Sequence, residues 1–184
     1  QATRGWDWGL LLAAAFSLVA AWPFILQPGL SRTNATENHV FMAQDFADAM
    51  REGRLYPRWS PHVFSGYGAP IPNFYPPGAA YLTGLIKVLF TNDVVLAARI
   101  VYVLAFVVAG VSLFTLVNRR ANAAAALLAV ILYVYSPYFA HTVPQLRGDL
   151  PGMVALALLP AMLTLWDRLL TRNQAQDLIF VAVL

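Results

Sequence analysis

The sequence of 184 residues contains no cysteine, and charged residues make up only 11% of it. The absence of cysteine excludes disulfide bonds and thiolate metal sites. The scarcity of charge argues against an ordinary soluble domain, in which about a quarter of the residues are charged. Apolar residues make up 59% of the chain, and its mean hydropathy is +0.60. The composition therefore predicts an integral membrane protein.

The chain also lacks a stripe or patch of basic residues. Its formal charge is +3, but the arginines are scattered near the ends of apolar segments. A nucleic-acid-binding protein gathers its cations on one face or along one helix. We therefore expect no nucleic-acid partner and attribute the charges to membrane topology.

Apolar runs of membrane-spanning length divide the chain. A helix needs roughly 20 apolar residues to cross the hydrocarbon core of a bilayer. The runs predict spans at about 6–26, 94–117, 121–138 and 152–166, and a truncated span at 177–184. Because the last run stops before it could cross, we expect the chain to be the N-terminal part of a longer membrane domain. The first run could instead be an uncleaved signal sequence, but its length and aromatic flanks favour a span.

Residues 76–90 are apolar but would reach only about 22 Å as a helix. If this segment does not cross, five arginines lie on one side of the membrane: Arg4, Arg119, Arg120, Arg168 and Arg172. The positive-inside rule identifies that side as the cytoplasm. If the segment does cross, most of these arginines move outside, which the rule disfavours. We therefore predict that residues 76–90 lie on the outer membrane surface and that the loops 27–93 and 140–151 share the outer side.

The outer loop at 27–93 is long and carries its own structural signals. Asn38 can cap a helix at about 39–52, in which apolar residues fall on one face and acidic residues elsewhere. This pattern predicts a second surface-lying amphipathic helix beside the one at 76–90. The rest of the loop is rich in proline, glycine and aromatic residues, which favours fixed turns over disorder. We expect a folded cap over a site that faces the membrane.

Several short motifs occur in order along this part of the chain. They are HVF at 39–41, GRLYPRW at 53–59, GYGAP at 66–70, NFYPP at 73–77, AAR at 97–99 and QLRGD at 145–149. Their order resembles the first outer loop and second span of the bacterial membrane family called 6-pyruvoyl-tetrahydropterin synthase-related, a name that denotes a membrane domain and not pterin chemistry. That family is similar to GT-C-type glycosyltransferases, which use polyprenyl-phosphate sugars. The resemblance, from about Thr33 to Pro160, implies an all-α, polytopic, GT-C-like helix bundle in the bacterial cytoplasmic (inner) membrane.

The resemblance also implies a site on the outer surface. Glycosyl transfer to a hydroxyl needs a carboxylate that accepts a proton and cations that steady the departing phosphate. Relatives carry an aspartate shortly before the histidine corresponding to His39, where this chain has Glu37, and many carry a glutamate at the position of Gly152, for which Asp149 is the nearest substitute. The catalytic candidates are Glu37, His39 and Asp149, and the phosphate-binding candidates are Arg54, Arg58, Arg99 and Arg147.

These residues also have structural interpretations. Glu37 could be a solvated residue that favours a helix start, and His39 could simply lie at the membrane interface. Arg54 and Arg58 could contact lipid headgroups, and Arg99 could extend its charge toward the interface. The three histidines are far apart in the sequence and lack a spacing of four residues, so we expect no metal site and no cofactor; a divalent metal has no motif in its favour.

Two functions of different class stay open. The first is a glycosyltransferase that uses a polyprenyl-phosphate-linked sugar. The second is a catalytically silent structural subunit of a larger membrane complex, which the displaced acids favour. Membrane lipids are expected partners in both cases, a polyprenyl-phosphate sugar in the first and other membrane protein subunits in the second.

Overall fold

A computed structural model of the chain describes residues 8–172. The predicted span at 177–184 therefore lies outside the described residues. Within that range the chain is helical, and it has no strand beyond one isolated antiparallel bridge between Ser60 and Ala69. The predicted fold class, an all-α membrane helix bundle, is confirmed.

Four helices form the body of the bundle: α1 (Trp8–Ala20), α5 (Val94–Arg120), α6 (Ala123–Val134) and α7 (Leu150–Arg172). A short helix, α2 (Trp22–Leu26), follows α1, and a π-helical segment, η3 (Tyr138–Arg147), follows α6. The stretches Val94–Arg120, Ala123–Arg147 and Leu150–Leu170 are long and apolar enough to cross a membrane. The helix α1 is apolar but shorter.

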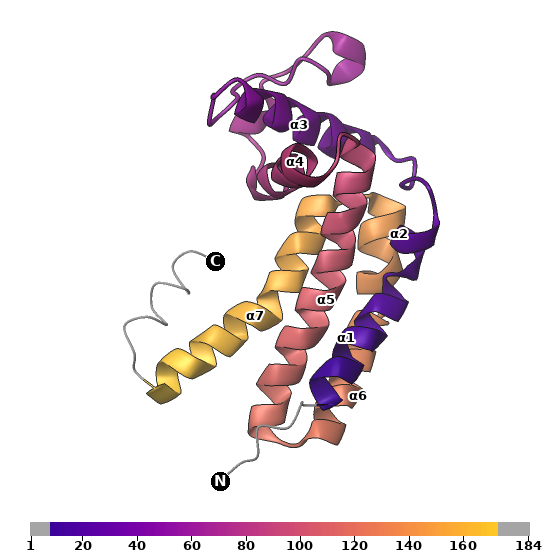
Figure 1. Ribbon diagram of the computed structural model, residues 1–184, viewed down its shortest axis with the longest axis vertical. Helices are drawn as coiled ribbons and strands as arrows, with labels where there is room; N and C mark the ends of the chain where they lie inside the picture. The colour runs from indigo at the N-terminus through magenta and orange to yellow at the C-terminus, as the bar shows by residue number, and fades with distance from the viewer. Residues whose placement is uncertain (1–7, 173–184) are drawn as a thin grey trace.

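Two further helices, α3 (Asn34–Arg51) and α4 (Gly78–Phe90), pack on each other across one end of the bundle. The loop between them carries two single turns, η1 (Phe64–Gly66) and η2 (Ile71–Asn73). The turn from η3 to α7 lies at the same end, whereas the α5–α6 turn and the end of α7 lie at the other (Figure 1). The positions of the two membrane surfaces along this bundle stay a prediction.

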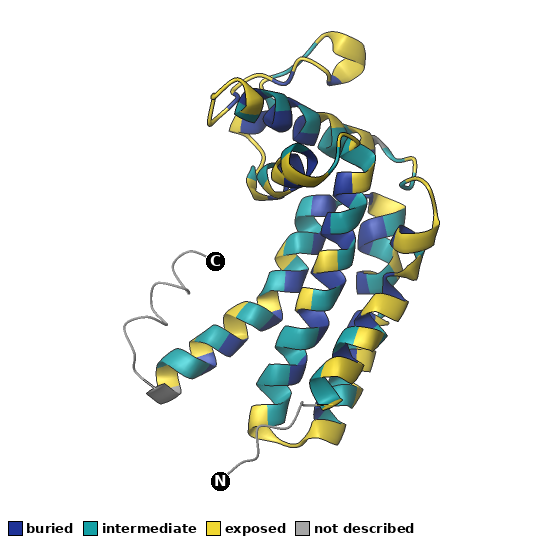
Figure 2. Ribbon diagram, viewed as in Figure 1, coloured by how far each residue is buried: buried dark blue, intermediate teal, exposed yellow. Residues whose placement is uncertain are grey.

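The hydrophobic core lies along α5, which contacts α1, α4, α6 and α7. Buried residues line α5 and the faces of its neighbours, and exposed residues cover the outer faces (Figure 2). Many α5 core positions are small, among them Ala98, Ala105 and Ala109. Small residues let helix backbones approach closely, which drives helix association where water is absent. Large apolar side chains such as Leu104 and Leu132 remain exposed and can contact lipid.

Two local predictions were wrong. The helix predicted from residue 39 begins at Asn34, because Thr33 and not Asn38 is its N-cap: the Thr33 hydroxyl oxygen accepts the Thr36 N–H at 3.1 Å. The predicted loop 140–151 is helical as far as Arg147. Proline is tolerated at a helix start. Because Pro137 immediately precedes η3, it is compatible with a new helical segment that begins at the next residue.

Candidate functional site

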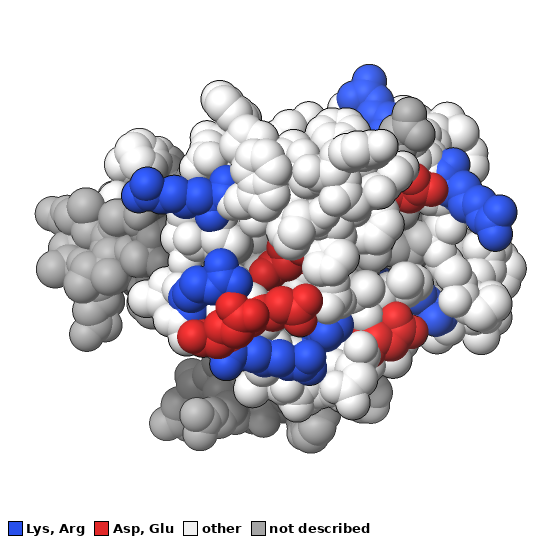
Figure 3. Space-filling view, turned by 90° about the horizontal axis from the view of Figure 1, so that it is seen from above, with Lys and Arg blue, Asp and Glu red and all other residues white. Residues whose placement is uncertain are grey.

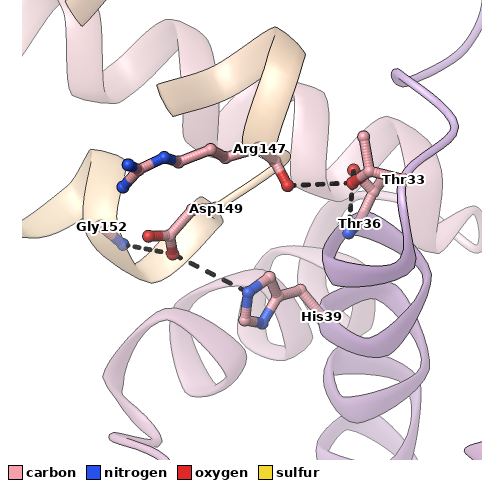
Figure 4. A network of polar contacts seen from close by, with 6 residues as sticks. All are labelled: Thr33, Thr36, His39, Arg147, Asp149 and Gly152. Atoms are coloured by element: carbon pink, nitrogen blue, oxygen red, sulfur yellow. Dashed lines mark hydrogen bonds and ion pairs between the residues drawn. The ribbon is translucent and has the colours of Figure 1, made fainter. Parts of the chain in front are cut away.

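The start of α3 touches the turn between η3 and α7. The Thr33 hydroxyl donates to the Arg147 carbonyl oxygen at 2.9 Å, across 114 residues of sequence. Because this uses the only proton of the Thr33 hydroxyl, the Thr36 hydroxyl must be the donor in the 2.9 Å contact between the two side chains. Figure 4 shows this network. The two predicted outer segments therefore meet. We call this contact the junction: it comprises Thr33, Thr36 and His39 on one side and Arg147, Gly148 and Asp149 on the other.

Gly148 makes this close approach feasible. It has φ +66° and ends η3 in the left-handed conformation. A Cβ atom at this position would lie 1.9 Å from Thr36 Oγ1 and 2.5 Å from Thr33 Oγ1. Both the backbone angle and the space at position 148 therefore require glycine.

Asp149 follows directly and caps α7. Its Oδ1 atom accepts the Gly152 N–H at 2.9 Å, which satisfies a backbone donor in the first turn of the helix. A Cβ atom at position 152 would lie 2.3 Å from Asp149 Oδ2. The Asp149 carboxylate thus occupies the space into which a side chain at position 152 would extend.

His39 of α3 lies opposite this carboxylate. The distance from His39 Nε2 to Asp149 Oδ1 is 3.8 Å, and 11% of the His39 side chain is exposed against 40% of that of Asp149 (Figure 4). Burial lowers the pKa of His39, and the nearby Asp149 carboxylate raises it partly back. His39 therefore favours its neutral form, and a proton placed on it would be stabilised by Asp149.

A cavity of about 320 Å³ adjoins His39. Apolar and aromatic side chains line most of it, including Met42, Phe64 and Ile71. The Tyr75 ring also lines it and meets the His39 ring edge-on, with 6.3 Å between the ring centroids. The imidazole is thus positioned at the wall of a cavity that could receive part of a substrate.

Arg147 places a cation beside the same turn. Its guanidinium carbon lies 5.8 Å from the centre of the Tyr138 ring, and its side chain is exposed. In Figure 4 the side chain points away from Thr33, which bonds only to the Arg147 backbone. The guanidinium therefore takes no part in the hydrogen bond that holds the Arg147 backbone.

The remaining predicted residues lie apart from this junction. Glu37 is exposed and lines two other cavities, one of which shares Asn38 and Phe64 with the cavity beside His39. Its side chain leaves α3 in another direction from that of His39, since two residues along a helix turn a side chain by about 200°. Arg54 is paired with Glu52. Arg58 is exposed. Arg99 donates to the carbonyl oxygens of Phe24 and Ile25, at 2.8 and 2.9 Å, and so caps the C-terminal end of α2.

Sequence reasoning missed the contacts of Thr33, Thr36 and Gly148. Thr33 before an amphipathic run was an available cap signal, because threonine is a preferred N-cap residue. The close packing of Gly148 had no local signal, because it depends on a segment more than a hundred residues away. Among residues 8–172, no group of three or more histidines and acids could hold a metal ion.

A model of the dolichyl-phosphate-mannose-protein mannosyltransferase family matches residues 75–184, which is more than half of the chain. The chain belongs to this family. No curated protein and no solved structure matches the chain significantly. Membership of the mannosyltransferase family, together with three helices of spanning length, identifies a multi-pass membrane protein with a GT-C-like fold. The matched region contains Arg147 and Asp149 but does not include α3, which carries His39.

Proposed function

We propose that the protein is a membrane glycosyltransferase that uses a polyprenyl-phosphate-linked sugar at the outer face of the bacterial cytoplasmic membrane. The observation that carries this proposal is the junction at which His39 faces Asp149 at 3.8 Å beside a cavity. The family name supports a lipid-phosphate donor, with mannose as the first sugar to test. The finer resemblance, to the 6-pyruvoyl-tetrahydropterin synthase-related family, stays a prediction.

The junction suits transfer to a hydroxyl. The acceptor oxygen attacks the anomeric carbon of the sugar, the bond from that carbon to the phosphate oxygen breaks, and the phosphate leaves with the electron pair. The acceptor proton passes to neutral His39, and the Asp149 carboxylate stabilises the imidazolium that forms. The 3.8 Å gap between them is too long for a hydrogen bond and would shorten once His39 carries the proton.

Arg147 is the arginine that we assign to the departing phosphate. It is exposed and lies two residues before Asp149. Arg54 and Arg99 already bond Glu52 and the α2 carbonyls, respectively, so engagement of a phosphate would cost them those contacts. Arg58 is a secondary phosphate-binding candidate, because it has no ion pair among the described residues.

The test uses the full-length protein in vesicles that contain polyprenyl-phosphate mannose labelled in the sugar. Release of label to water and its transfer to membrane lipids are both measured. Asp149→Asn keeps the helix cap but removes the charge, and His39→Gln removes the base. Each is expected to lower kcat by roughly a hundredfold or more. The double variant should lose little further, because the two residues act as one unit.

Glu37→Gln is the matched comparison, because Glu37 is an exposed acid on the same helix that does not line the cavity beside His39. We expect it to retain near-normal turnover, and Arg147→Gln to lower kcat, because the guanidinium is assigned to the charge that develops on the departing phosphate. If only Glu37→Gln abolishes transfer, the proton acceptor is wrongly assigned. If the wild-type protein transfers nothing from mannose or glucose donors and purifies in stoichiometric complex with other membrane subunits, the structural-subunit alternative is correct.

A further inference from the structure

A second cavity, of about 450 Å³, lies beside the C-terminal half of α3. Its lining combines three carboxylates, two guanidiniums and one imidazole with a tryptophan and two prolines. Acidic and basic side chains lie side by side on the face of the molecule seen in Figure 3. No residue of this cavity belongs to the His39 junction.

Asp45 and His62 form the polar floor of this cavity. Only 2% of the Asp45 side chain is exposed, and its Oδ1 atom is bonded to His62 Nδ1. Burial raises the pKa of Asp45, and the bond from His62 and the nearby Ser60 hydroxyl oppose that rise. With the carboxylate ionised, Nδ1 of a neutral imidazole is the donor and Nε2 is an acceptor, and about half of the His62 side chain is exposed.

Two polar atoms beneath the same floor are closed to a ligand. Asp45 Oδ2 and the Ser60 hydroxyl oxygen are buried, and neither has a partner in hydrogen-bonding geometry. The Ser60 hydroxyl nevertheless lies close enough to favour the ionised carboxylate. Because both atoms are buried, a ligand in the cavity reaches the exposed half of His62 and the carboxylates and guanidiniums around it.

The charges around the cavity favour a ligand without charge. Arg54 is paired with Glu52, and Arg51 lies 3.9 Å from Asp48. An anion would compete with these carboxylates for the guanidiniums and would also face Asp45. The planar carboxylate and guanidinium groups offer paired acceptors and donors that match neighbouring hydroxyls of a ligand.

Trp59 supplies an aromatic wall, with 54% of its side chain exposed. Its position is fixed from behind, because a Cβ atom on Gly68 would lie 2.5 Å from the indole Nε1. The bridge between Ser60 and Ala69, with N–H···O distances of 2.9 and 3.0 Å, holds these two segments together. A rigid indole face is suited to pack against the apolar C–H face of a sugar ring.

We propose that this cavity binds a neutral carbohydrate, with Trp59 as the stacking wall and with His62, held in place by Asp45, as a partner of the sugar hydroxyls. Asp45 lies six residues after His39, which is about 9 Å along the helix axis. The site is therefore a neighbour of the proposed transfer site on the same helix. The inference goes beyond the transfer reaction, because it requires binding whether or not the protein is a catalyst.

The test measures binding of methyl glycosides of mannose, glucose and galactose to the full-length protein in detergent, by saturation-transfer NMR without any lipid donor. We expect signals for at least one of these neutral sugars and weaker ones for methyl glucuronide, which is anionic. Trp59→Ala should weaken binding by about tenfold or more, and Trp59→Phe should retain most of it. Gly68→Ala should also weaken binding, because it displaces the indole.

Trp166→Ala is the matched control. Its side chain is 53% exposed, nearly the same as that of Trp59, but it lies near the end of α7 that is remote from α3. The proposal is overturned if no neutral glycoside binds, if only the glucuronide binds, or if Trp59→Ala and Trp166→Ala have equal effects. Asp149→Asn should leave glycoside binding unchanged, so a failed transferase proposal does not by itself affect this result.

Discussion

At the junction of α3 and α7, the pKa of His39 is lowered, because burial penalises its charged form more than Asp149 stabilises it. A histidine with a depressed pKa stabilises the folded state at pH values above the unfolded pKa of about 6.5. That contribution is lost as the pH falls from about 6.5 through the folded pKa. The same depression keeps the imidazole available as a proton acceptor in mildly acidic solution.

Removal of the Asp149 charge should therefore lower the pKa of His39 further. NMR titration of protein labelled at histidine should give a midpoint for His39 below 6.5, and a still lower one in Asp149→Asn, because the group that raises the pKa is lost. The resonance is assigned by its disappearance in His39→Gln. A higher midpoint in Asp149→Asn would contradict the electrostatic role given to Asp149.

Gly148 offers a test of the packing at the same junction. Gly148→Ala combines a strained positive φ with a clash against Thr36, and should cost roughly 2–4 kcal/mol of unfolding free energy. Gly53→Ala is the matched control, because Gly53 has φ +75° but a Cβ atom added there would meet nothing within 4 Å. It should cost only about 1 kcal/mol from the backbone. Equal losses in thermal unfolding would show that the clash is absent.

Among the helices, the pairing of α1 with α5 depends on two small residues. Ser17 of α1 is buried, and its hydroxyl donates to the Ala13 carbonyl at 2.8 Å. Gly110 of α5 lies against it, so that a Cβ atom at 110 would be 1.9 Å from Ser17 Oγ. The helices α3 and α4 approach each other in the same way at Gly84, close to the backbone of Ala43 and Ala47. These helix contacts therefore depend on the small size of residues such as glycine as much as on apolar side chains.

We expect Gly110→Ala to separate α1 from α5 and to lower the thermal unfolding temperature measurably. Ser17→Ala alone should have a small effect, because it loses only a bond within its own helix. The double variant should recover most of the loss, since the closest atoms that then remain lie 3.3 and 3.4 Å away. A double variant as unstable as Gly110→Ala would mean that the Ser17 hydroxyl is not the obstacle.

Over the whole molecule, the two candidate sites lie at one end of the bundle, and the α5–α6 turn lies at the other. The end that carries α3, α4 and the η3–α7 turn contains the His39 junction and the second cavity (Figure 1). At the other end, Arg120 at the end of α5 bonds Asp167 of α7. The arginines near the α5–α6 turn and the end of α7 predict, by the positive-inside rule, that this end faces the cytoplasm and that the end with the candidate sites faces outward.

Because the chain has no cysteine, single introduced thiols can test this topology. Ser65→Cys and Asn92→Cys, both at exposed positions on either side of α4, should react with a membrane-impermeant maleimide added to intact cells. Ala121→Cys, in the α5–α6 turn, should react only after permeabilisation. If α4 crossed the membrane, Asn92→Cys would be protected and Ala121→Cys would react from outside.

Local pattern was enough to predict the helical membrane class, because an apolar run such as that of α5 must satisfy its backbone hydrogen bonds within one helix. The amphipathic character of α3 was likewise visible from its spacing. Its first residue was missed, because both Thr33 and Asn38 can cap a helix and only the folded chain shows which one does.

The partners at the candidate site could not be predicted in this way. His39 and Asp149 were both named from a family resemblance, but their 3.8 Å separation depends on Gly148 packing against Thr33 and Thr36. No sequence pattern indicated that Asp45 and His62 lie together, because one is on a helix and the other is in an irregular loop, and these share no periodicity. Hydropathy and residue spacing report on near neighbours in the chain. A site forms where segments remote in the sequence pack together and exclude water, so only the folded structure shows which residues meet.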